Sequence, residues 1–94
     1  MTIVSVCGFG VGSSLILKLS IDKAFKELGM NFEAINADII TAKSTECDAI
    51  FTSFQMAEDL RREVKVPVIA IDKYMDVVEV KAALEKFIAE FNSK

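Results

Sequence analysis

Histidine is absent from the sequence, and its absence excludes several kinds of site. A catalytic triad, a metal site built on imidazole and a phosphoryl group carried on histidine all need a residue that this chain lacks. Cysteine is scarce: Cys7 and Cys47 are too few for a disulfide framework, and in a reducing compartment no structural bridge is expected. We therefore expect a protein without a resident metal or cofactor.

Long apolar runs and clusters of basic residues are missing as well. No run approaches the ~20 residues of a membrane helix, and the N-terminus lacks the basic flank and apolar stretch of a secretion signal. Acidic and basic residues are interspersed, with a formal net charge of −3, whereas nucleic acids and anionic membranes favour clustered Lys and Arg. These absences predict a cytoplasmic protein with no nucleic-acid partner and no direct membrane insertion.

Residues that break regular structure are few, with one proline and four glycines among 94 residues. The composition, 52% hydrophobic and 27% charged, suits a compact globule and not a disordered chain. The length fits one domain, so residues 1–94 are assigned to a single unit.

Short apolar runs alternate along the chain with segments of helical spacing, which predicts strands separated by helices. The strands are expected at residues 3–6, 32–37, 48–52 and 66–71, and the helices at 13–28, from 54 and from 76. One or two further helical turns are expected within 39–47. Strands that alternate with helices imply a parallel sheet with right-handed crossovers. The first and third strands are the most apolar and should be central. The sequence therefore predicts an α/β fold: a single-domain, four-stranded parallel sheet in the order 2-1-3-4 with helices on both faces.

Local signals mark the ends of several elements. Gly29 should end the first helix, and Ser53 is a suitable N-cap for the helix that follows it. Asp76 with Glu79 three residues later has the spacing of a capping box, and Pro67 suits the start of an edge strand. The last helix should bury a stripe made of Val77, Val80, Leu84, Phe87, Ile88 and Phe91.

The segment after the first strand carries the chemistry. In the order 2-1-3-4, the topological switch point lies between the first and third strands, and such sheets bind ligands beyond their carboxyl ends there. The segment at this point is Cys7-Gly8-Phe9-Gly10-Val11-Gly12-Ser13-Ser14. Alternate glycines let backbone N–H groups turn inward, and the helix that follows adds partial positive charge, so Gly8 through Ser14 form a predicted phosphate-binding loop. The same field should lower the pKa of the Cys7 thiol and make it a nucleophile toward phosphorus.

Three related motifs fit this loop less well. A Walker A loop needs Gly-Lys-Ser/Thr at its end, where this chain has Gly12-Ser13-Ser14, and the dinucleotide fingerprint needs glycine at position 13. A tyrosine-phosphatase loop, Cys-x5-Arg, needs arginine at position 13, and no late Asp-Pro supplies a general acid. The missing arginine and the missing Asp-Pro favour storage of a thiophosphate over its hydrolysis.

Other residues outside the glycine frame lead to weaker expectations. Cys47 precedes a strand without a glycine cradle and is interpreted as structural. Phe9 and Val11 either pack inward or form a docking patch for a partner, and the sequence leaves both readings open. Asp38 and Asp72 are interpreted as solvated carboxylates at strand ends.

The segment from Val6 to Ser14, followed by Leu15-Ile16-Leu17-Lys18, resembles the phosphocysteine loop of phosphotransferase-system (PTS) enzyme IIB components. The ascorbate type is the most similar, with the lactose/chitobiose and galactitol types more distant. The resemblance implies a IIB subunit whose Cys7 accepts phosphate from a phosphohistidine on enzyme IIA. Cys7 then passes it to a sugar held by the membrane-bound enzyme IIC, with Gly8, Phe9, Gly10, Val11, Gly12, Ser13 and Ser14 around the phosphoryl group.

The sequence thus predicts a phosphotransferase that carries a phosphoryl group during sugar uptake. Two alternatives stay open. A small cysteine-dependent phosphatase would turn over an aryl phosphate. A non-catalytic regulatory binding domain would acquire no phosphate from a phosphorelay.

Overall fold

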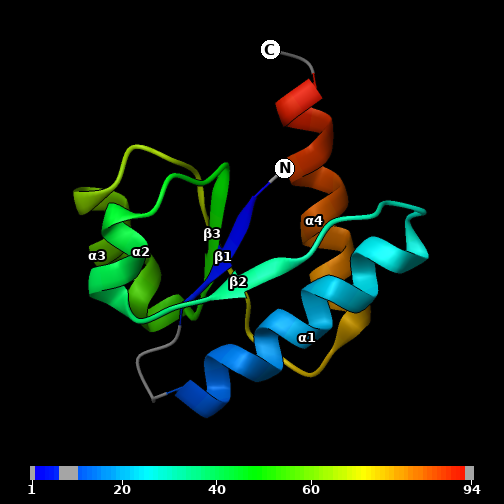
Figure 1. The fold of residues 1–94 in the computed structure, drawn as a ribbon, viewed down its shortest axis with the longest axis horizontal. Coiled ribbons are helices and arrows are strands. Elements are labelled where there is room, and N and C mark those ends of the chain that lie inside the picture. Colours follow the sequence, from blue (N-terminus) through cyan, green and yellow to red (C-terminus); the bar gives the residue numbers. More distant parts are fainter. Residues whose placement is uncertain (1, 7–10, 93–94) are drawn as a thin grey trace.

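The computed structural model describes residues 2–6 and 11–92, with residues 11–14 described by their backbone alone. Strands and helices alternate along the chain (Figure 1). The elements are β1 (Ile3–Ser5), α1 (Val11–Glu27), β2 (Ala34–Asn36), α2 (Ile39–Ser44), β3 (Ala49–Thr52), α3 (Phe54–Glu63), β4 (Val68–Ala70) and α4 (Val77–Asn92).

The four strands form one parallel sheet in the order β2-β1-β3-β4, which confirms the predicted topology. In the register of this sheet Ser5 of β1 lies between Asn36 of β2 and Phe51 of β3, and Phe51 lies opposite Ile69 of β4. The central strands β1 and β3 are buried along their whole length, as their apolar runs predict.

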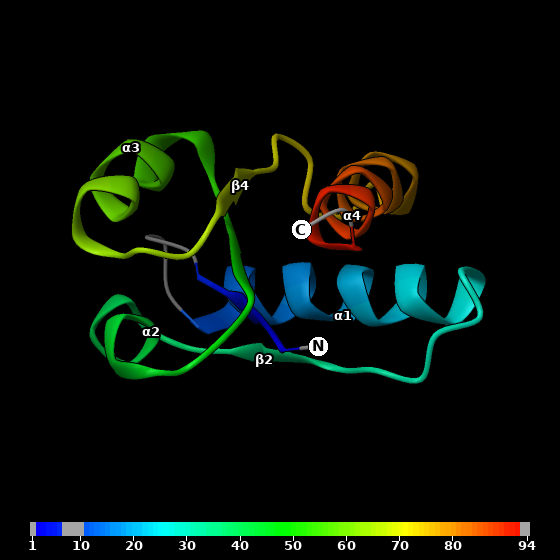
Figure 2. The same cartoon turned by 90° about the horizontal axis from the view of Figure 1, so that it is seen from above.

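Helices cover both faces of the sheet, as predicted, and each face has its own core (Figure 2). On one face α1 and α4 bury Leu17, Ile21, Val80 and Leu84 against the sheet. On the other face α2 and α3 bury smaller side chains, including Ala42 and Ala57, against Val4 and Ile50. No helix within the described ranges has the length and apolarity needed to span a bilayer.

Gly29 ends α1 through a backbone conformation that other residues rarely adopt. Its φ is +74°, and the chain reverses with hydrogen bonds from Gly29 N–H to the Lys26 carbonyl (3.1 Å) and from Met30 N–H to the Phe25 carbonyl (2.9 Å). These are the two bonds of a Schellman motif, in which glycine takes the left-handed position. The predicted stop is confirmed.

Side chains cap the N-termini of α2 and α3. The Ser53 hydroxyl accepts a hydrogen bond from Met56 N–H at 3.3 Å, which confirms the predicted cap of α3. Asp38 accepts from Thr41 N–H at 2.7 Å and caps α2. This hydrogen bond lowers the pKa of the exposed Asp38 carboxyl, because it favours the charged form. Asp38 is therefore a capping residue and not only a solvated carboxylate.

The start of α4 has one of the two contacts of the predicted capping box: the N-cap side chain is engaged, but the Glu79 carboxylate binds elsewhere. Asp76 Oδ1 accepts from Val78 N–H (3.0 Å) and Glu79 N–H (3.3 Å), as an N-cap does. The Glu79 carboxylate does not return to Asp76; it accepts from the N–H groups of Asp72 (2.7 Å) and Lys73 (3.3 Å). Because Asp76 N–H already donates to the Lys73 carbonyl (3.1 Å), Glu79 is free to hold the preceding loop.

Several boundaries differ from the prediction by one or two residues. Helix α1 begins at Val11, two residues before the expected position. The strands are shorter than their apolar runs, although single backbone hydrogen bonds continue the ladders, as from Ala37 N–H to the Ser5 carbonyl (3.0 Å). In the stripe of α4, Phe91 is 41% exposed. Its ring lies in the last turn, 5.7 Å from the Phe87 ring and beside an open cleft, so the core does not cover it.

Candidate functional site

The carboxyl ends of β1 and β3 meet at the predicted switch point. The two strands are neighbours, and Val6 N–H, just beyond β1, donates to the Phe51 carbonyl at 2.9 Å. Cys7, Gly8, Phe9 and Gly10 lie outside the described residues. The chain is described again from Val11, where α1 begins. The topology therefore places Val6, the residue before the predicted loop, at the edge of the sheet where such folds bind ligands.

The second half of the predicted phosphate-binding loop is helical. The backbone of Val11, Gly12, Ser13 and Ser14 forms the first turn of α1. The sequence spacing predicted a helix from Ser13, so Val11 and Gly12 join the helix two residues earlier than predicted. The assignment of Val11 through Ser14 as phosphate-binding residues stays a prediction. A helical first turn keeps the predicted chemistry, because the first N–H groups of a helix have no carbonyl partner within the helix.

The N-terminus of α1 is electrostatically open to an anion. The helix has 17 residues and no acidic residue in its first turn. A helix of this length carries partial positive charge at its N-terminus, which a first-turn carboxylate would otherwise offset. An anion bound at this terminus would therefore meet a helix dipole that no first-turn carboxylate offsets.

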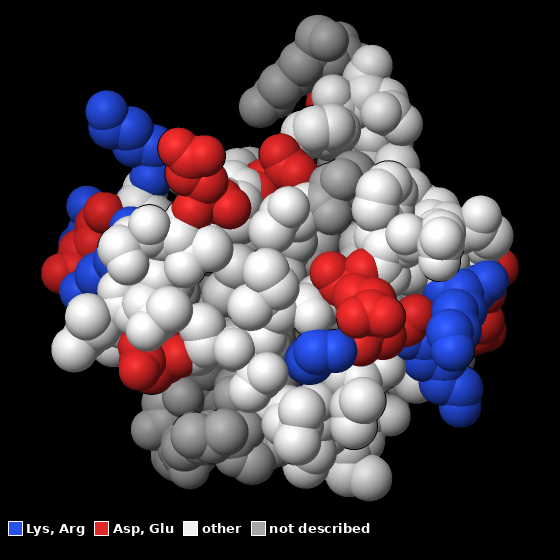
Figure 3. Space-filling model, viewed as in Figure 1, with Lys and Arg blue, Asp and Glu red and all other residues white. Residues whose placement is uncertain are grey.

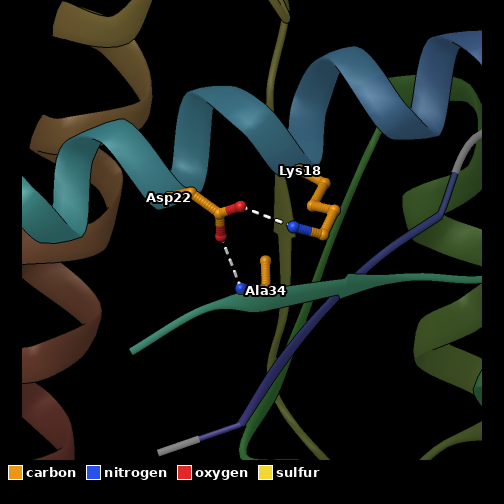
Figure 4. Close-up of polar contacts among 3 residues, drawn as sticks. All are labelled: Lys18, Asp22 and Ala34. Atoms are coloured by element: carbon orange, nitrogen blue, oxygen red, sulfur yellow. Dashed lines mark hydrogen bonds and ion pairs between the residues drawn. The ribbon is translucent and has the colours of Figure 1, made fainter. Parts of the chain in front are cut away.

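Lys18, the first basic residue after the loop, is already paired (Figure 4). Its Nζ lies 2.5 Å from Asp22 Oδ2 one turn along α1, and Asp22 Oδ1 accepts from Ala34 N–H at 2.6 Å. The Lys18 side chain is 21% exposed. Because Lys18 is engaged with Asp22, we expect backbone dipoles to meet most of the charge of an anion bound at this terminus.

The N-terminus of α3 and the loop after β4 form a small cleft beside the switch point. It is about 320 Å³ in volume and is lined by Ser53, Phe54, Gln55, Ile71, Asp72 and Tyr74. The loop after β4 is held in place from two sides: Ser20 of α1 donates to the Tyr74 carbonyl at 2.5 Å, and Glu79 accepts from Asp72 N–H. The walls next to the candidate site are thus fixed by hydrogen bonds from α1 and α4.

Cys47 lies away from this edge. It precedes β3 and so stands at the amino end of the sheet, where it is half-buried beside the core between α2, α3 and the sheet. Burial raises the pKa of its thiol, and the charge of Asp48 raises it further. A thiol held in its neutral form is a poor nucleophile, which agrees with the structural role predicted for Cys47.

An exposed apolar surface lies on α1 just after the first turn. Ile16 (41% exposed), Leu19 (57%) and Met75 (79%) border a shallow hollow of about 220 Å³ between α1 and the loop before α4. The sequence reading named Phe9 and Val11 as docking candidates and missed these three. The sequence pattern does indicate Ile16 and Leu19, because they lie outside the buried helical stripe that contains Leu17 and Ile21.

On the face in Figure 3, acidic and basic side chains are intermixed. Within residues 2–6 and 11–92, no three Cys, Asp or Glu side chains gather as a metal ion would require.

Comparison with known proteins gives one consistent picture. Residues 2–86 match the model of a family described as "PTS system, Lactose/Cellobiose specific IIB subunit". The chain is 28% identical over 88 residues to the ascorbate-specific PTS system EIIB component of Mycoplasma pneumoniae, which covers 92% of this chain and 93% of that protein. The fold is that of the lactose-specific IIB component domain from Streptococcus pneumoniae, with a TM-score of 0.69 at 15% identity over 96% and 95% of the two chains.

Proposed function

The chain belongs to the family of lactose/cellobiose-specific PTS IIB subunits, and from this premise we propose that it carries the phosphoryl group on Cys7. IIB components are the phosphotransferase components of a sugar phosphotransferase system. Of the two cysteines, only Cys7 follows a strand that ends at the switch point, whereas Cys47 precedes a strand and is half-buried. Gly8 through Ser14 are proposed to bind the phosphoryl oxygens.

One observation carries this proposal: α1 begins four residues after Cys7, at the carboxyl edge of β1, with no acidic residue in its first turn. The N-terminus of such a helix favours a thiolate over a thiol and a phosphoryl group over water. It can therefore support both forms of the carrier, the free thiolate that receives phosphate and the thiophosphate that stores it.

The transfer consists of two displacements at phosphorus. In the first, the Cys7 sulfur attacks the phosphorus of a phosphohistidine on enzyme IIA; the S–P bond forms, the N–P bond breaks and the imidazole nitrogen keeps the electron pair. In the second, a sugar hydroxyl oxygen attacks the same phosphorus; the O–P bond forms, the S–P bond breaks and Cys7 leaves as a thiolate. The hydroxyl proton passes to a base beside the sugar or to water. Backbone dipoles around the phosphoryl group stabilise both transition states.

The partners proposed for these steps are enzyme IIA as donor and membrane-bound enzyme IIC as holder of the sugar, with this chain on the cytoplasmic side. Transient interfaces are often small, and beside the first turn of α1 such a contact would find the exposed apolar side chains of Ile16, Leu19 and Met75. The ascorbate-specific relative makes ascorbate the first substrate to test.

The proposal is tested by phosphorylating the protein with a IIA protein that carries phosphohistidine and mapping the added mass. We expect one phosphoryl group on Cys7. Cys7→Ser should abolish the labile thiophosphate, and the matched variant Cys47→Ser should retain it. Label retained in Cys7→Ser and lost in Cys47→Ser would overturn the assignment.

A further inference from the structure

Strand β4 ends the sheet, and among the described residues no strand pairs with its outer edge. It is the last strand in the order β2-β1-β3-β4 and lies between α3 and α4 (Figure 2). Ile71 N–H, just beyond β4, donates to the Thr52 carbonyl of β3 at 2.8 Å. Because alternate residues of a parallel strand face opposite neighbours, Val68 and Ala70 direct their N–H and C=O groups away from β3. Such an edge is a template for another extended chain.

A groove, here called the edge groove, follows this open strand. It consists of two clefts of about 430 Å³ and 550 Å³, and both clefts have Pro67, Phe87 and Glu90 in their walls. Phe54 of α3 lines the first cleft and is 60% exposed, and Phe91 of α4 lines the second and is 41% exposed. Aromatic side chains are common anchors of protein interfaces. The edge groove therefore combines apolar contact area with open backbone hydrogen-bonding groups.

Positive charge exceeds negative charge along the edge groove. Its walls contain three basic side chains, Arg61, Lys65 and Lys86. None of the three forms an ion pair with a carboxylate in the part of the chain that the structure describes. Arg61 donates to the outward carbonyl of Val68 at 3.0 Å, which holds a guanidinium group at the strand edge. The walls also contain two carboxylates, Asp48 and Glu90, and Asp48 accepts from a backbone N–H at 2.7 Å. In a chain with a net charge of −3, this local excess of cations favours an acidic occupant.

We propose that the edge groove binds an extended, acidic segment of a protein partner, which adds to the sheet as a fifth strand beside β4. The backbone of the segment pairs with the outward groups of Val68 and Ala70, and its side chains point alternately toward α3 and α4. Its carboxylates meet the three basic side chains. A second copy of this chain is a poorer occupant, because a two-fold axis at the strand edge would bring the same cations together. The walls contain no residue of the predicted phosphate-binding segment, so this docking site is independent of the function proposed for Cys7.

The probe is a synthetic heptapeptide of alternating Glu and Val, acetylated and amidated at its ends, titrated into ¹⁵N-labelled protein. Hydrogen exchange at the Val68 and Ala70 amides should slow several-fold as the peptide saturates the groove, because these N–H groups gain carbonyl partners. The amides of Ile69 and Ile71 face β3 and should exchange slowly with or without peptide, which makes them the internal control. A peptide of the same length with Lys in place of Glu should bind more weakly.

Lys86→Glu reverses one charge in the wall of the groove and should lower the affinity for the Glu-Val peptide several-fold. Lys23→Glu makes the same change at another exposed helix position, outside the groove, and should leave the affinity unchanged. Unaltered exchange at Val68 and Ala70 up to millimolar peptide, or equal affinity for the two peptides, would overturn the inference.

Slowing of the Val68 and Ala70 amides that grows with protein concentration, without any peptide, would assign the edge to a second copy of the chain and also overturn the inference. None of these measurements involves phosphate. Their outcome is therefore separate from that of the function proposed for Cys7.

Discussion

Asp22 of α1 accepts a hydrogen bond from the backbone N–H of Ala34 at 2.6 Å and so ties the edge strand β2 to the helix that precedes it (Figure 4). The Ala34 side chain is almost fully buried, and the other carboxylate oxygen of Asp22 contacts Lys18. The loop after α1 is therefore closed by a side chain that reaches 12 residues ahead.

We predict that Asp22→Ala lowers the free energy of unfolding by about 2 kcal/mol, because it leaves the Ala34 N–H unpaired in a partly buried place. Urea denaturation at neutral pH measures the change. Lys18→Met, which removes only the ion pair, should cost less than about 1 kcal/mol. A larger loss for Lys18→Met than for Asp22→Ala would mean that the ion pair, and not the strand contact, is the stabilising interaction.

The sheet order could be predicted because the apolar runs differ in strength. The most apolar runs became the central strands β1 and β3, and the caps at Gly29 and Ser53 followed from local backbone chemistry that acts over three or four residues. The contacts that sequence reasoning missed join distant segments. Glu79 reaches back to Asp72 and Asp22 reaches forward to Ala34, and neither spacing has a pattern of its own.

Only part of the candidate site could be predicted, because its local pattern is visible in the sequence and its long-range geometry is not. Glycine spacing after a strand indicates a phosphate loop, but it does not show where the helix begins, and α1 starts inside the predicted loop at Val11.

The two thiols should titrate on opposite sides of the ordinary cysteine value of ~8.5. The N-terminus of α1 should lower the pKa of Cys7, whereas burial raises the pKa of Cys47. Alkylation rates followed against pH by mass spectrometry should therefore show Cys7 reacting first at neutral pH. A Cys7 titration at or above the ordinary value would contradict the proposed anion cradle.

The raised pKa of Cys47 also has a consequence for stability. A group whose pKa is higher in the folded state adds stability below its unfolded pKa, and that stability is lost as pH rises through the folded value. The free energy of unfolding should thus fall more steeply above about pH 9 in Cys7→Ser than in the double variant Cys7→Ser/Cys47→Ala. Identical slopes would show that Cys47 titrates normally.

Docking to the phosphate donor should depend on the apolar surface after the first turn of α1. Leu19 is 57% exposed there, and in small transient interfaces a few side chains carry most of the affinity. Leu19→Ser should slow transfer from IIA several-fold without changing the Cys7 pKa. Phe9→Ser should do the same if the Phe9 side chain contacts the donor. Phe91→Ser changes an exposed ring at the C-terminal end of α4 and is the control. Wild-type rates in Leu19→Ser would exclude this surface from docking.

The last prediction concerns the lifetime of the phosphorylated form and separates a carrier from a phosphatase. A cysteine phosphatase stabilises a charged transition state twice, and it does so with an arginine at the phosphoryl oxygens and an acid that protonates the leaving group. This chain has Ser13 at the arginine position, no histidine and no late Asp-Pro.

Loss of one strong donor of this kind costs about 10²–10³ in rate, and here the acid is missing too. Purified phosphoprotein should therefore lose phosphate slowly in buffer, followed by mass spectrometry, and quickly to the sugar-loaded IIC. Ser13→Arg should shorten the lifetime in buffer, because it places a cation in the first turn of α1. Lys23→Arg, further along the helix, should leave it unchanged. Rapid release by the wild-type protein, or brisk cleavage of an aryl phosphate, would favour the phosphatase. A carrier can store phosphate only if the site does not catalyse the attack of water on phosphorus.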